Sequence, residues 1–407
     1  MPPTGTQIQQ QPPLARAKEL PTLTPVEELD PKTFRPPLCP WPQCSAHRRD
    51  APIFHYQRFG WFRRKLDGRR VPRFRCGVCR RTFSQQTFAF SYYLKRPALS
   101  APIAAGLVAG CCHRQLGRSL ACSHTTVTKR SARLGRHALL LHELCLSRIQ
   151  HLSEPVVIDD FETFTGCQDF PCGIGTAVGQ RSQFVLSLSH APHGRGGKLN
   201  RFQRRKRDQR ERRFGRPPRG SYQRAFRRHL ELLLAHCQGR LRLVTDGHSG
   251  YKTAIRRHPQ RERIEHQIYP NPPRGPKGAP SSPAAILRDR AMFAVDLLHK
   301  LLRHSQAHHR RETSAFSRRD VATLERGFLA VVWRNLVKPR SERKANQPTP
   351  AMTVGMARRR WTWRDVLARR LQPSLVPGQR WYMDVYRREI RTPMLTGNPQ
   401  HQLKNAF

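Results

Sequence analysis

VVIDDFETF (residues 156–164) places three β-branched apolar residues directly before two aspartates. Because Pro155 precedes this run, Val156–Ile158 is predicted to be a short buried strand that ends at Asp159. A carboxylate at the C-terminal end of a central strand is well placed to hold a metal ion. The alternative is a capped strand that leads into a turn, in which the aspartates have no role in chemistry.

A second aspartate follows a second apolar strand. LRLVT, residues 241–245, is predicted to be a strand, and Asp246 and a Gly-His-Ser-Gly turn come directly after it. Between the two aspartate strands, residues 172–191 predict two more strands joined by a polar turn, and residues 225–237 predict a helix. Strands and helices that mix in this way indicate the α/β class.

The charge of the chain indicates a polyanionic partner. There are 75 Lys and Arg against 27 Asp and Glu, a formal net charge of +48. Nucleic acid is the first candidate and an anionic membrane surface the second. Residues 195–228 hold fifteen of the basic residues and two acids, so this segment is predicted to be a solvated or disordered arm that could also clamp a DNA backbone. No apolar run is long enough for a membrane span, and the Pro/Gln-rich start lacks the apolar core of a secretory signal.

Four of the eleven cysteines form two closely spaced pairs. The segment between the pairs alternates aromatic and basic residues around Asp67-Gly68, which is a strong hairpin signal. Two cysteine knuckles bridged by a hairpin predict a zinc ribbon, in which four thiolates complete a closed structural site. Free buried cysteines are the alternative, and His47 is a possible substitute ligand. The predicted zinc ligands are Cys39, Cys44, Cys76 and Cys79.

A helix-turn-helix is predicted after the cysteine segment. His113–Leu120 can form one helix, and Ser123 is a good N-cap for a second helix from His124 to about Leu134. A plain helical hairpin inside a core is the alternative, and the neighbouring basic zinc ribbon favours the reading of DNA. The predicted DNA-binding residues at the start of the second helix are Thr125, Thr126, Thr128, Lys129 and Arg130.

An amphipathic helix is predicted over residues 291–304, AMFAVDLLHKLLRH. Its expected polar side carries Asp296, His299, Lys300 and Arg303 at helical spacing. A second long helix is predicted from Val321 to Val337. The apolar side of the first helix is expected to consist of Phe293, Leu297, Leu298, Leu301 and Leu302.

These motifs together resemble the DDE/D transposases of bacterial insertion sequences, in particular those that place a zinc ribbon and a helix-turn-helix before an RNase H-like catalytic core. The resemblance extends over roughly Cys39 to Pro339. It is carried by FRCGVCRRTFS, RLGRHALL, VVIDDFETF, LVTDGHSGY, VDLLHKLLRH, RRETSAFSRR and WRNLVKP. Each aspartate strand is a weak motif by itself, whereas the order of all the modules is fairly specific.

The resemblance implies three metal-binding carboxylates. Asp159 matches the first acid, and Asp160 is a weaker choice; Asp246 matches the second. Asp296 matches the third because it lies seven residues before Arg303, and Glu312 is the alternative. The implied activity is DNA cleavage and strand transfer with Mg²⁺ or Mn²⁺, whose hard charge suits carboxylate oxygens. A DNA-binding regulator or an inactive transposase remnant is the rival interpretation.

The expected organisation follows from these assignments. It comprises a leader (1–33), a zinc ribbon (34–95), a helix-turn-helix domain (96–150), an RNase H-like core (151–340) with a basic insertion around 190–238, and a basic C-terminal tail (341–407). The expected partners are double-stranded DNA, as element ends and target, and further copies of the chain, with no membrane. The expected location is the bacterial cytoplasm, in association with the nucleoid.

Overall fold

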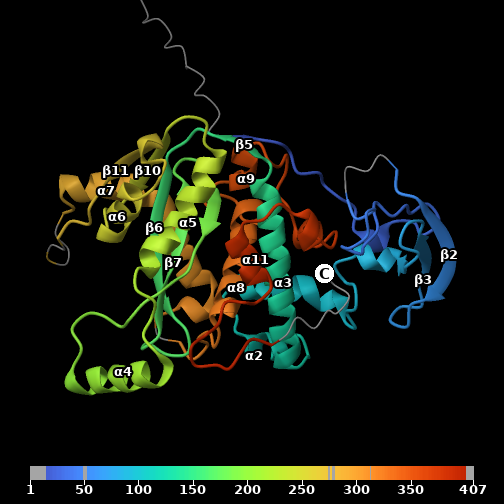
Figure 1. Cartoon of the computed structure of the whole chain (residues 1–407), viewed down its shortest axis with the longest axis horizontal. Helices are drawn as coiled ribbons and strands as arrows, with labels where there is room; N and C mark the ends of the chain where they lie inside the picture. Colours follow the sequence, from blue (N-terminus) through green and yellow to red (C-terminus); the bar gives the residue numbers. More distant parts are fainter. Residues whose placement is uncertain (1–14, 49–52, 274–275, 277–279, 312, 400–407) are drawn as a thin grey trace, which may run out of the picture.

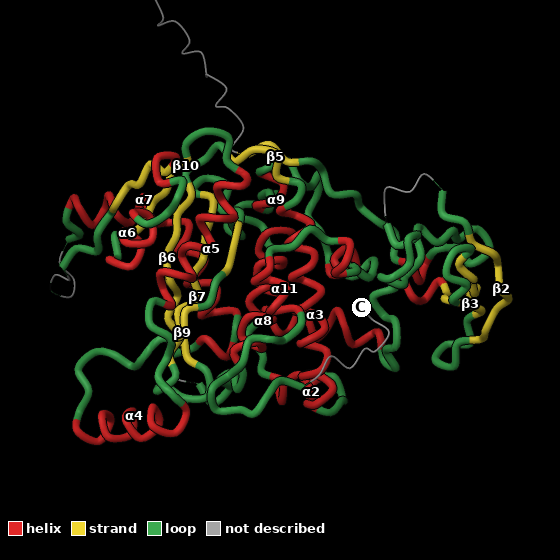
Figure 2. The backbone as a smooth tube through the Cα atoms, in the orientation of Figure 1, coloured by secondary structure: helices red, strands yellow, loops and turns green. Residues whose placement is uncertain are grey.

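The structure is a computed structural model that describes residues 15–48, 53–273, 276, 280–311 and 313–399. It contains a mixed sheet flanked by helices, which confirms the α/β class, and a smaller three-stranded sheet near the N-terminus (Figure 1). The two sheets form separate groups of strands at opposite sides of the molecule (Figure 2). Glu312, the alternative third acid, lies outside the described residues, as do parts of the predicted leader and tail.

The central sheet has the strand order β11-β10-β6-β7-β8, and the short β9 also pairs with β7. β6 is antiparallel to β7, and β7 is antiparallel to β8, whereas β10 is parallel to both β6 and β11. β6 therefore lies in the middle of the sheet. The strands are β6 (Val156–Phe164), β7 (Pro171–Gly179), β8 (Val185–Leu188), β9 (Ala191–Pro192), β10 (Leu241–Thr245) and β11 (Ile264–Ile268).

The prediction that the first strand ends at Asp159 is wrong, because β6 continues to Phe164. The whole strand pairs with β7, from Val156 opposite Gly179 to Phe164 opposite Pro171. The two aspartates are therefore inside a strand. Since successive side chains of a strand point to opposite faces, Asp159 and its neighbour Asp160 lie on different sides of the sheet.

Helices cover both faces of the sheet. α7 (Pro283–Ser305) packs on β6, β7 and β10, and it contains the predicted helix 291–304. Its buried side is rotated from the prediction: Met292 and Val295 are fully buried, while Phe293 is 54% exposed. On the other face, α5 (Ser221–His236) packs on β7 and β8 and contacts α6 (Ser249–Arg256).

A helical layer stands between the central sheet and the smaller sheet (Figure 1). It contains α1 (Ser100–Val108), α2 (His113–Ser119), α3 (His124–Leu146) and α8 (Asp320–Val332), which continues as a π-helical turn (Trp333–Val337). Asn335 in that turn bonds both the N–H and the C=O of Val185, at 2.9 Å each. The exposed edge of β8 is thereby covered, as a sheet edge requires. No described helix is long and apolar enough to cross a membrane.

Much of the predicted leader and tail belongs to the folded structure. β1 (Ala15–Ala17) pairs with β5 (Ile149–Leu152), and Leu20 is buried. After residue 340 the described chain adds three short helices whose apolar residues, including Val366, join the main core. The segment 341–399 is therefore part of the core and not a basic tail. The three helices are α9 (Pro350–Thr353), α10 (Trp363–Val366) and α11 (Arg380–Tyr386).

The cysteine module, residues 34–48 and 53–88, is built on the small antiparallel sheet. β2 (Tyr56–Arg63) and β3 (Arg70–Cys76) form a hairpin, and β4 (Thr82–Ser84) pairs with β3. Gly68 has a φ of +69°, which only glycine adopts readily, so the hairpin predicted at Asp67-Gly68 is confirmed. The module has its own buried cluster around Phe74 and Phe88.

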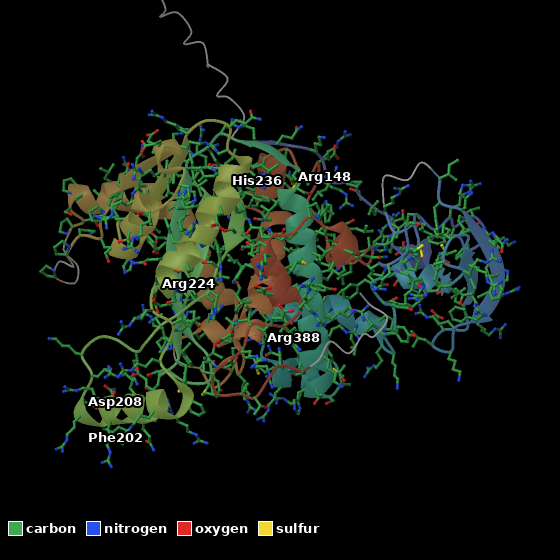
Figure 3. The ribbon with its side chains drawn as sticks, in the orientation of Figure 1. Arg148, Phe202, Asp208, Arg224, His236 and Arg388 are labelled. Carbon is green, nitrogen blue, oxygen red and sulfur yellow. The ribbon has the colours of Figure 1, made fainter. Side chains whose placement is uncertain are left out.

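The basic segment after Arg195 contains a helix that extends from the body of the protein. α4 (Arg201–Phe214) has no buried residue, and its side chains spread outward around the labelled Phe202 and Asp208 (Figure 3). Asn200 caps its first turn through a hydrogen bond from Gln203 N. The side chain of Asp169, only 3% exposed, pairs with Arg195 and with an arginine of the helix, so the segment is anchored. The expected arm is thus ordered and helical.

Candidate metal centres and nucleic-acid interface

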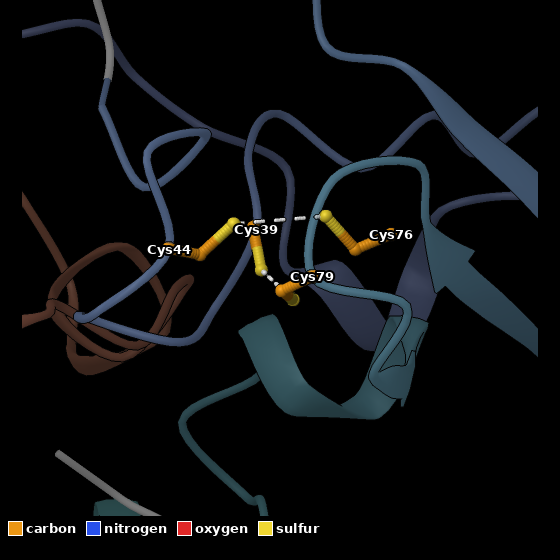
Figure 4. Close-up of side chains that lie close together, drawn as sticks. All are labelled: Cys39, Cys44, Cys76 and Cys79. Atoms are coloured by element: carbon orange, nitrogen blue, oxygen red, sulfur yellow. Dashed lines mark hydrogen bonds between the residues drawn. The ribbon is translucent and has the colours of Figure 1, made fainter.

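The four predicted zinc ligands converge in one place (Figure 4). Their sulfur atoms all lie within 4.8 Å of one another. The Cys39 and Cys79 sulfurs are 3.7 Å apart, and those of Cys44 and Cys76 are 3.8 Å apart. A tetrahedral ion with Zn–S bonds of about 2.3 Å requires sulfurs about 3.8 Å apart. The cluster therefore has the size and the ligand chemistry to hold a metal ion such as zinc.

Local turns present these sulfurs to one another. In the second knuckle, Arg80 N donates to Cys76 O at 3.1 Å, and Arg80 adopts a positive φ of 60° to close the turn. Cys39 and Cys76 are fully buried. Burial raises the pKa of the Cys39 thiol, so its thiolate form needs a cation beside it. A metal ion supplies that cation and would add stability to a module with a small core.

His47 does not serve as a fifth or substitute ligand in this arrangement. Its Nδ1 lies 2.7 Å from Cys39 O, and its Nε2 lies 2.6 Å from Ser374 Oγ. Both ring nitrogens are thus engaged in hydrogen bonds. His47 instead connects the cysteine module to the C-terminal part of the chain.

The acidic centre consists of Asp159, Asp246 and Asp296. Leu243 of β10 pairs with Val156 of β6, and the next residues of the two strands also pair. Continuing this parallel register by two residues sets Asp246 beside Asp159. The two aspartates predicted from separate strands therefore lie at the same level of neighbouring strands, at the point where β10 ends.

The electrostatics of Asp159 reflect this neighbourhood. Its pKa is raised to about 7, mainly by burial and then by repulsion from Asp246, with smaller contributions from Asp160 and Asp296. His299 of α7 has its Nδ1 3.8 Å from Asp159 Oδ2, and its Nε2 is 2.8 Å from Thr176 Oγ1. Burial and nearby arginines lower the pKa of His299 to about 3, so the ring is neutral. It does not offset the negative charge.

Asp296 is close enough to act on Asp159 but has another partner. It forms an ion pair with Arg288, which lies two turns earlier on α7, and its side chain is 39% exposed. Among the described residues, only the cysteines bring three or more ligand groups within reach of one ion. The carboxylates of Asp159, Asp246 and Asp296 therefore do not form such a group, and Asp296 is paired with Arg288. The sequence spacing that predicted Asp296 as a ligand gave no indication of its ion pair with Arg288.

Asp160 belongs to a second polar cluster on the opposite face. Its Oδ2 accepts a hydrogen bond from Tyr251 OH at 2.6 Å. Two residues further along β6, Glu162 accepts from Tyr222 OH and lies 2.8 Å from His193 Nε2. Alternate residues of a strand point to the same face, so the sequence could have indicated that Asp160 and Glu162 lie together. That inference required knowing that the strand continues past Asp159.

The predicted DNA-binding residues divide into two groups. Ser123 caps α3 as expected and accepts from Thr125 N at 3.1 Å. Thr125, Thr128 and Lys129 are exposed, and Thr126 is half-buried. Arg130 is 5% exposed, donates to Ser100 Oγ, and reaches Arg96 O at 3.2 Å. Arg130 therefore supports the helix pair from inside, where it cannot reach a base edge.

The hairpin of the cysteine module presents aromatic and basic residues to solvent. Trp61 and Phe62 are each 39% exposed, and Phe59 is 37% exposed. The guanidinium of Arg70 lies 5.5 Å from the centre of the Trp61 ring, and that of Arg75 lies 4.3 Å from the Phe59 ring. Exposed rings beside cations can stack on bases and contact phosphates.

Comparison with known proteins adds no family to this description. No family model matches the chain, and no curated protein matches it.

Proposed function

We propose that the protein is a DNA transposase of the DDE/D type, with an RNase H-like core that cleaves and joins DNA with divalent metal ions. The observation that carries this proposal is the parallel pairing of β6 and β10, whose register, continued by two residues, leads to Asp159 and Asp246. A helix that packs across both strands brings a third carboxylate, Asp296, into the same electrostatic neighbourhood. An RNase H-like core requires this combination of neighbouring strands and a crossing helix.

The charge of the acidic centre supports a cationic occupant. Burial, and then repulsion from Asp246, raise the pKa of Asp159 to about 7, a cost that a bound cation would remove. Two divalent ions held by carboxylate oxygens supply an activated oxygen nucleophile and stabilise the leaving oxygen. In this proposal Asp159 and Asp246 hold such ions, and Asp296 completes the set on release from Arg288. The neutral His299 lies beside Asp159, with its Nδ1 3.8 Å from Asp159 Oδ2.

DNA binding is supported by separate surfaces. The net charge of +48 matches a partner with many phosphates. The exposed start of α3, the aromatic face of the β2–β3 hairpin and the basic helix α4 each offer contacts of the kind that nucleic acid needs. Association of several copies on paired DNA ends is part of the proposal, by resemblance.

Strand transfer in vitro tests the proposal. Duplexes carrying the DNA that flanks the coding sequence, with one end pre-cleaved, are incubated with the protein, target DNA and Mg²⁺ or Mn²⁺. Joined products are expected with the unmodified protein and with Glu262→Ala, whose exposed carboxylate lies outside the acidic centre. They are expected to be absent with Asp246→Ala, while end binding is retained. Binding of the ends without nicking or joining by the unmodified protein would favour the DNA-binding regulator instead.

A further inference from the structure

A pocket of about 690 Å³ lies where the start of α3 meets α8. Its rim includes the exposed Thr125, Thr128 and Lys129, which are three of the predicted DNA-binding residues. Its inner wall is rich in arginine. We call it the arginine pocket and define it by Arg133, Arg136, Arg319, Glu325, Arg326 and Arg388.

A close helix crossing brings these arginines together. Gly135 of α3 packs directly on the backbone of Glu325 in α8, and a Cβ at position 135 would lie 2.4 Å from the Glu325 carbonyl oxygen. Only glycine permits this approach. Arg136 follows Gly135 on one helix and Arg326 follows Glu325 on the other, so the crossing brings into contact the two helix segments that carry these arginines. Arg133 lies one turn earlier on α3.

The inner arginines have hydrogen-bond donors without partners in the described structure. Arg136 is 7% exposed, and neither its Nε nor its Nη1 has an acceptor. The same is true of Arg133 Nη1 and Arg326 Nη2. Buried donors of charged groups are rarely left without acceptors, because the loss of water contacts is not compensated. Several N–H groups of the arginines that line the pocket therefore have no hydrogen-bond acceptor among the described residues.

The charge of the pocket is equally uncompensated. Among the described residues that line the pocket, Glu325 is the only acid, and it is paired with Arg388, whose Nε lies 3.0 Å from Glu325 Oε1. Burial, and then neighbouring arginines, lower the pKa of Arg133 to about 9, and burial lowers the pKa of Arg326 to about 10. Because arginine stays protonated in proteins, the lowered values reflect charged groups withdrawn from water and, for Arg133, also repulsion from neighbouring arginines. An anion would relieve this repulsion.

We propose that the arginine pocket binds a phosphate group. Guanidinium groups bind phosphate in a bidentate manner, and several arginines that line this pocket have N–H donors without an acceptor. The pocket is larger than one phosphate group. The threonines and Lys129 at its rim provide further hydrogen-bond donors for the rest of the molecule that bears the phosphate. The phosphate belongs either to a DNA backbone or to a free nucleoside phosphate. The DNA assignment rests on the proposed function, whereas phosphate binding itself does not.

Thermal unfolding with inorganic phosphate tests the pocket directly. At constant ionic strength, exchange of chloride for phosphate is expected to raise the Tm of the unmodified protein by about 1–3 °C. Arg136→Met is expected to lose this rise and to unfold at an equal or higher temperature without phosphate, because it removes an unpaired buried charge. Arg387→Met, an exposed arginine outside the pocket, is expected to keep the rise. A phosphate response that survives Arg136→Met overturns the proposal.

A rim variant covers the case in which Arg136→Met does not fold. Lys129→Met changes an exposed side chain of the pocket and is expected to weaken the phosphate response several-fold without lowering the Tm in chloride. If the Lys129 variant responds to phosphate as the unmodified protein does, the pocket is not the phosphate site.

Duplex DNA and metal-free ATP distinguish the two sources. If the pocket binds a backbone phosphate, Arg136→Met lowers the salt dependence of duplex binding by about one released counterion and leaves ATP binding unchanged. If it binds a free nucleoside phosphate, Arg136→Met abolishes ATP binding and leaves the salt dependence unchanged. No change in either measurement overturns the proposal. Phosphate binding without strand transfer would reject the proposed enzyme and leave the pocket standing.

Discussion

The cysteine cluster and the acidic centre are both candidate metal centres, yet only one is assembled. Four sulfurs lie within 4.8 Å of one another, at the separations that a tetrahedral ion requires. The carboxylates of Asp159, Asp246 and Asp296 share a neighbourhood, but Asp296 is paired with Arg288. The same chain therefore holds a closed set of ligands at one end and an open set at the other.

The chemistry of the ligands accounts for this difference. Thiols are neutral when protonated, so four of them can pack together in a small core without mutual repulsion. Carboxylates that approach one another repel unless they are protonated or a cation lies between them, and after burial this repulsion is the second cause of the raised pKa of Asp159. The thiol ligands of a structural site can therefore lie in their final positions without the metal ion. The carboxylate ligands of a catalytic site come together only when the metal ion is bound. Assembly of the acidic centre should therefore depend on pH and on divalent ions.

Removal of one sulfur is expected to have the largest effect. Cys76→Ser should reduce bound zinc from one ion per chain to almost none, and the apparent contribution of a structural zinc site is about 10 kcal/mol or more. The cysteine module should unfold while the central sheet stays folded, because the two have separate cores. Zinc content and limited proteolysis measure the two effects. Cys111→Ser, outside the cluster, should retain zinc; equal loss from both variants would contradict a four-cysteine site.

Removal of the Asp159 charge should stabilise the metal-free protein. Asp159 has a pKa of about 7 when folded against an ordinary value of 3.8, so the unfolded chain releases its proton first as pH rises. Stability is therefore lost between about pH 4 and pH 7, and Asp159→Asn avoids the loss. We expect a gain of about 1–3 kcal/mol in the free energy of unfolding at pH 8 and none near pH 4. Urea unfolding at both pH values measures it.

The control for this effect is magnesium. Saturating Mg²⁺ should stabilise the unmodified protein at pH 8 and should not stabilise Asp159→Asn to the same extent. A gain in stability that is the same at pH 4 and pH 8 would show that the substitution acts through packing and not through charge.

Local sequence signals identified the parts of the molecule whose structure is decided locally. Asp67-Gly68 predicted a hairpin because a glycine tolerates the positive φ of its turn. Ser123 predicted the start of α3 because a serine at that position bonds the free N–H groups of the first turn. The spacing of the cysteines predicted their convergence for the same reason, since each knuckle is a local turn.

Long-range contacts decided the rest. β6 extends past Asp159 because β7 pairs with its whole length, and the glycines of β7 leave room for the polar residues on one face. Phe293 is exposed because the rotation of α7 follows its contacts with the sheet, which its own periodicity does not specify. The segment after residue 340 has few apolar residues among many arginines, and residues such as Tyr382 are buried by packing against α3 and α8.

Proton competition should make Mg²⁺ binding at the acidic centre strongly dependent on pH. With a pKa of about 7, Asp159 is mostly protonated at pH 6 and mostly ionised at pH 8. Metal ligands must be deprotonated, so Mg²⁺ affinity should rise by about tenfold over this range. Titration of Mg²⁺ at each pH, followed by intrinsic fluorescence or calorimetry, measures the change. An affinity that stays constant between pH 6 and pH 8 would separate Asp159 from the metal.

The smallest effect concerns the arginine that holds Asp296. Arg288→Met removes both the partner of Asp296 and a positive charge near the ion site, so Mg²⁺ should bind about two- to fivefold more tightly. The gain is modest because the Asp296 side chain is 39% exposed and its ion pair is screened by water. Arg290→Met, an exposed arginine of the same helix, is the matched control for a general change in charge. If the two variants bind Mg²⁺ equally, Asp296 does not join the ion site, and the open set of ligands is only Asp159 and Asp246. If Arg288→Met alone binds more tightly, the acidic centre is held open by a single ion pair, and the contrast with the preassembled cysteines has a specific physical cause.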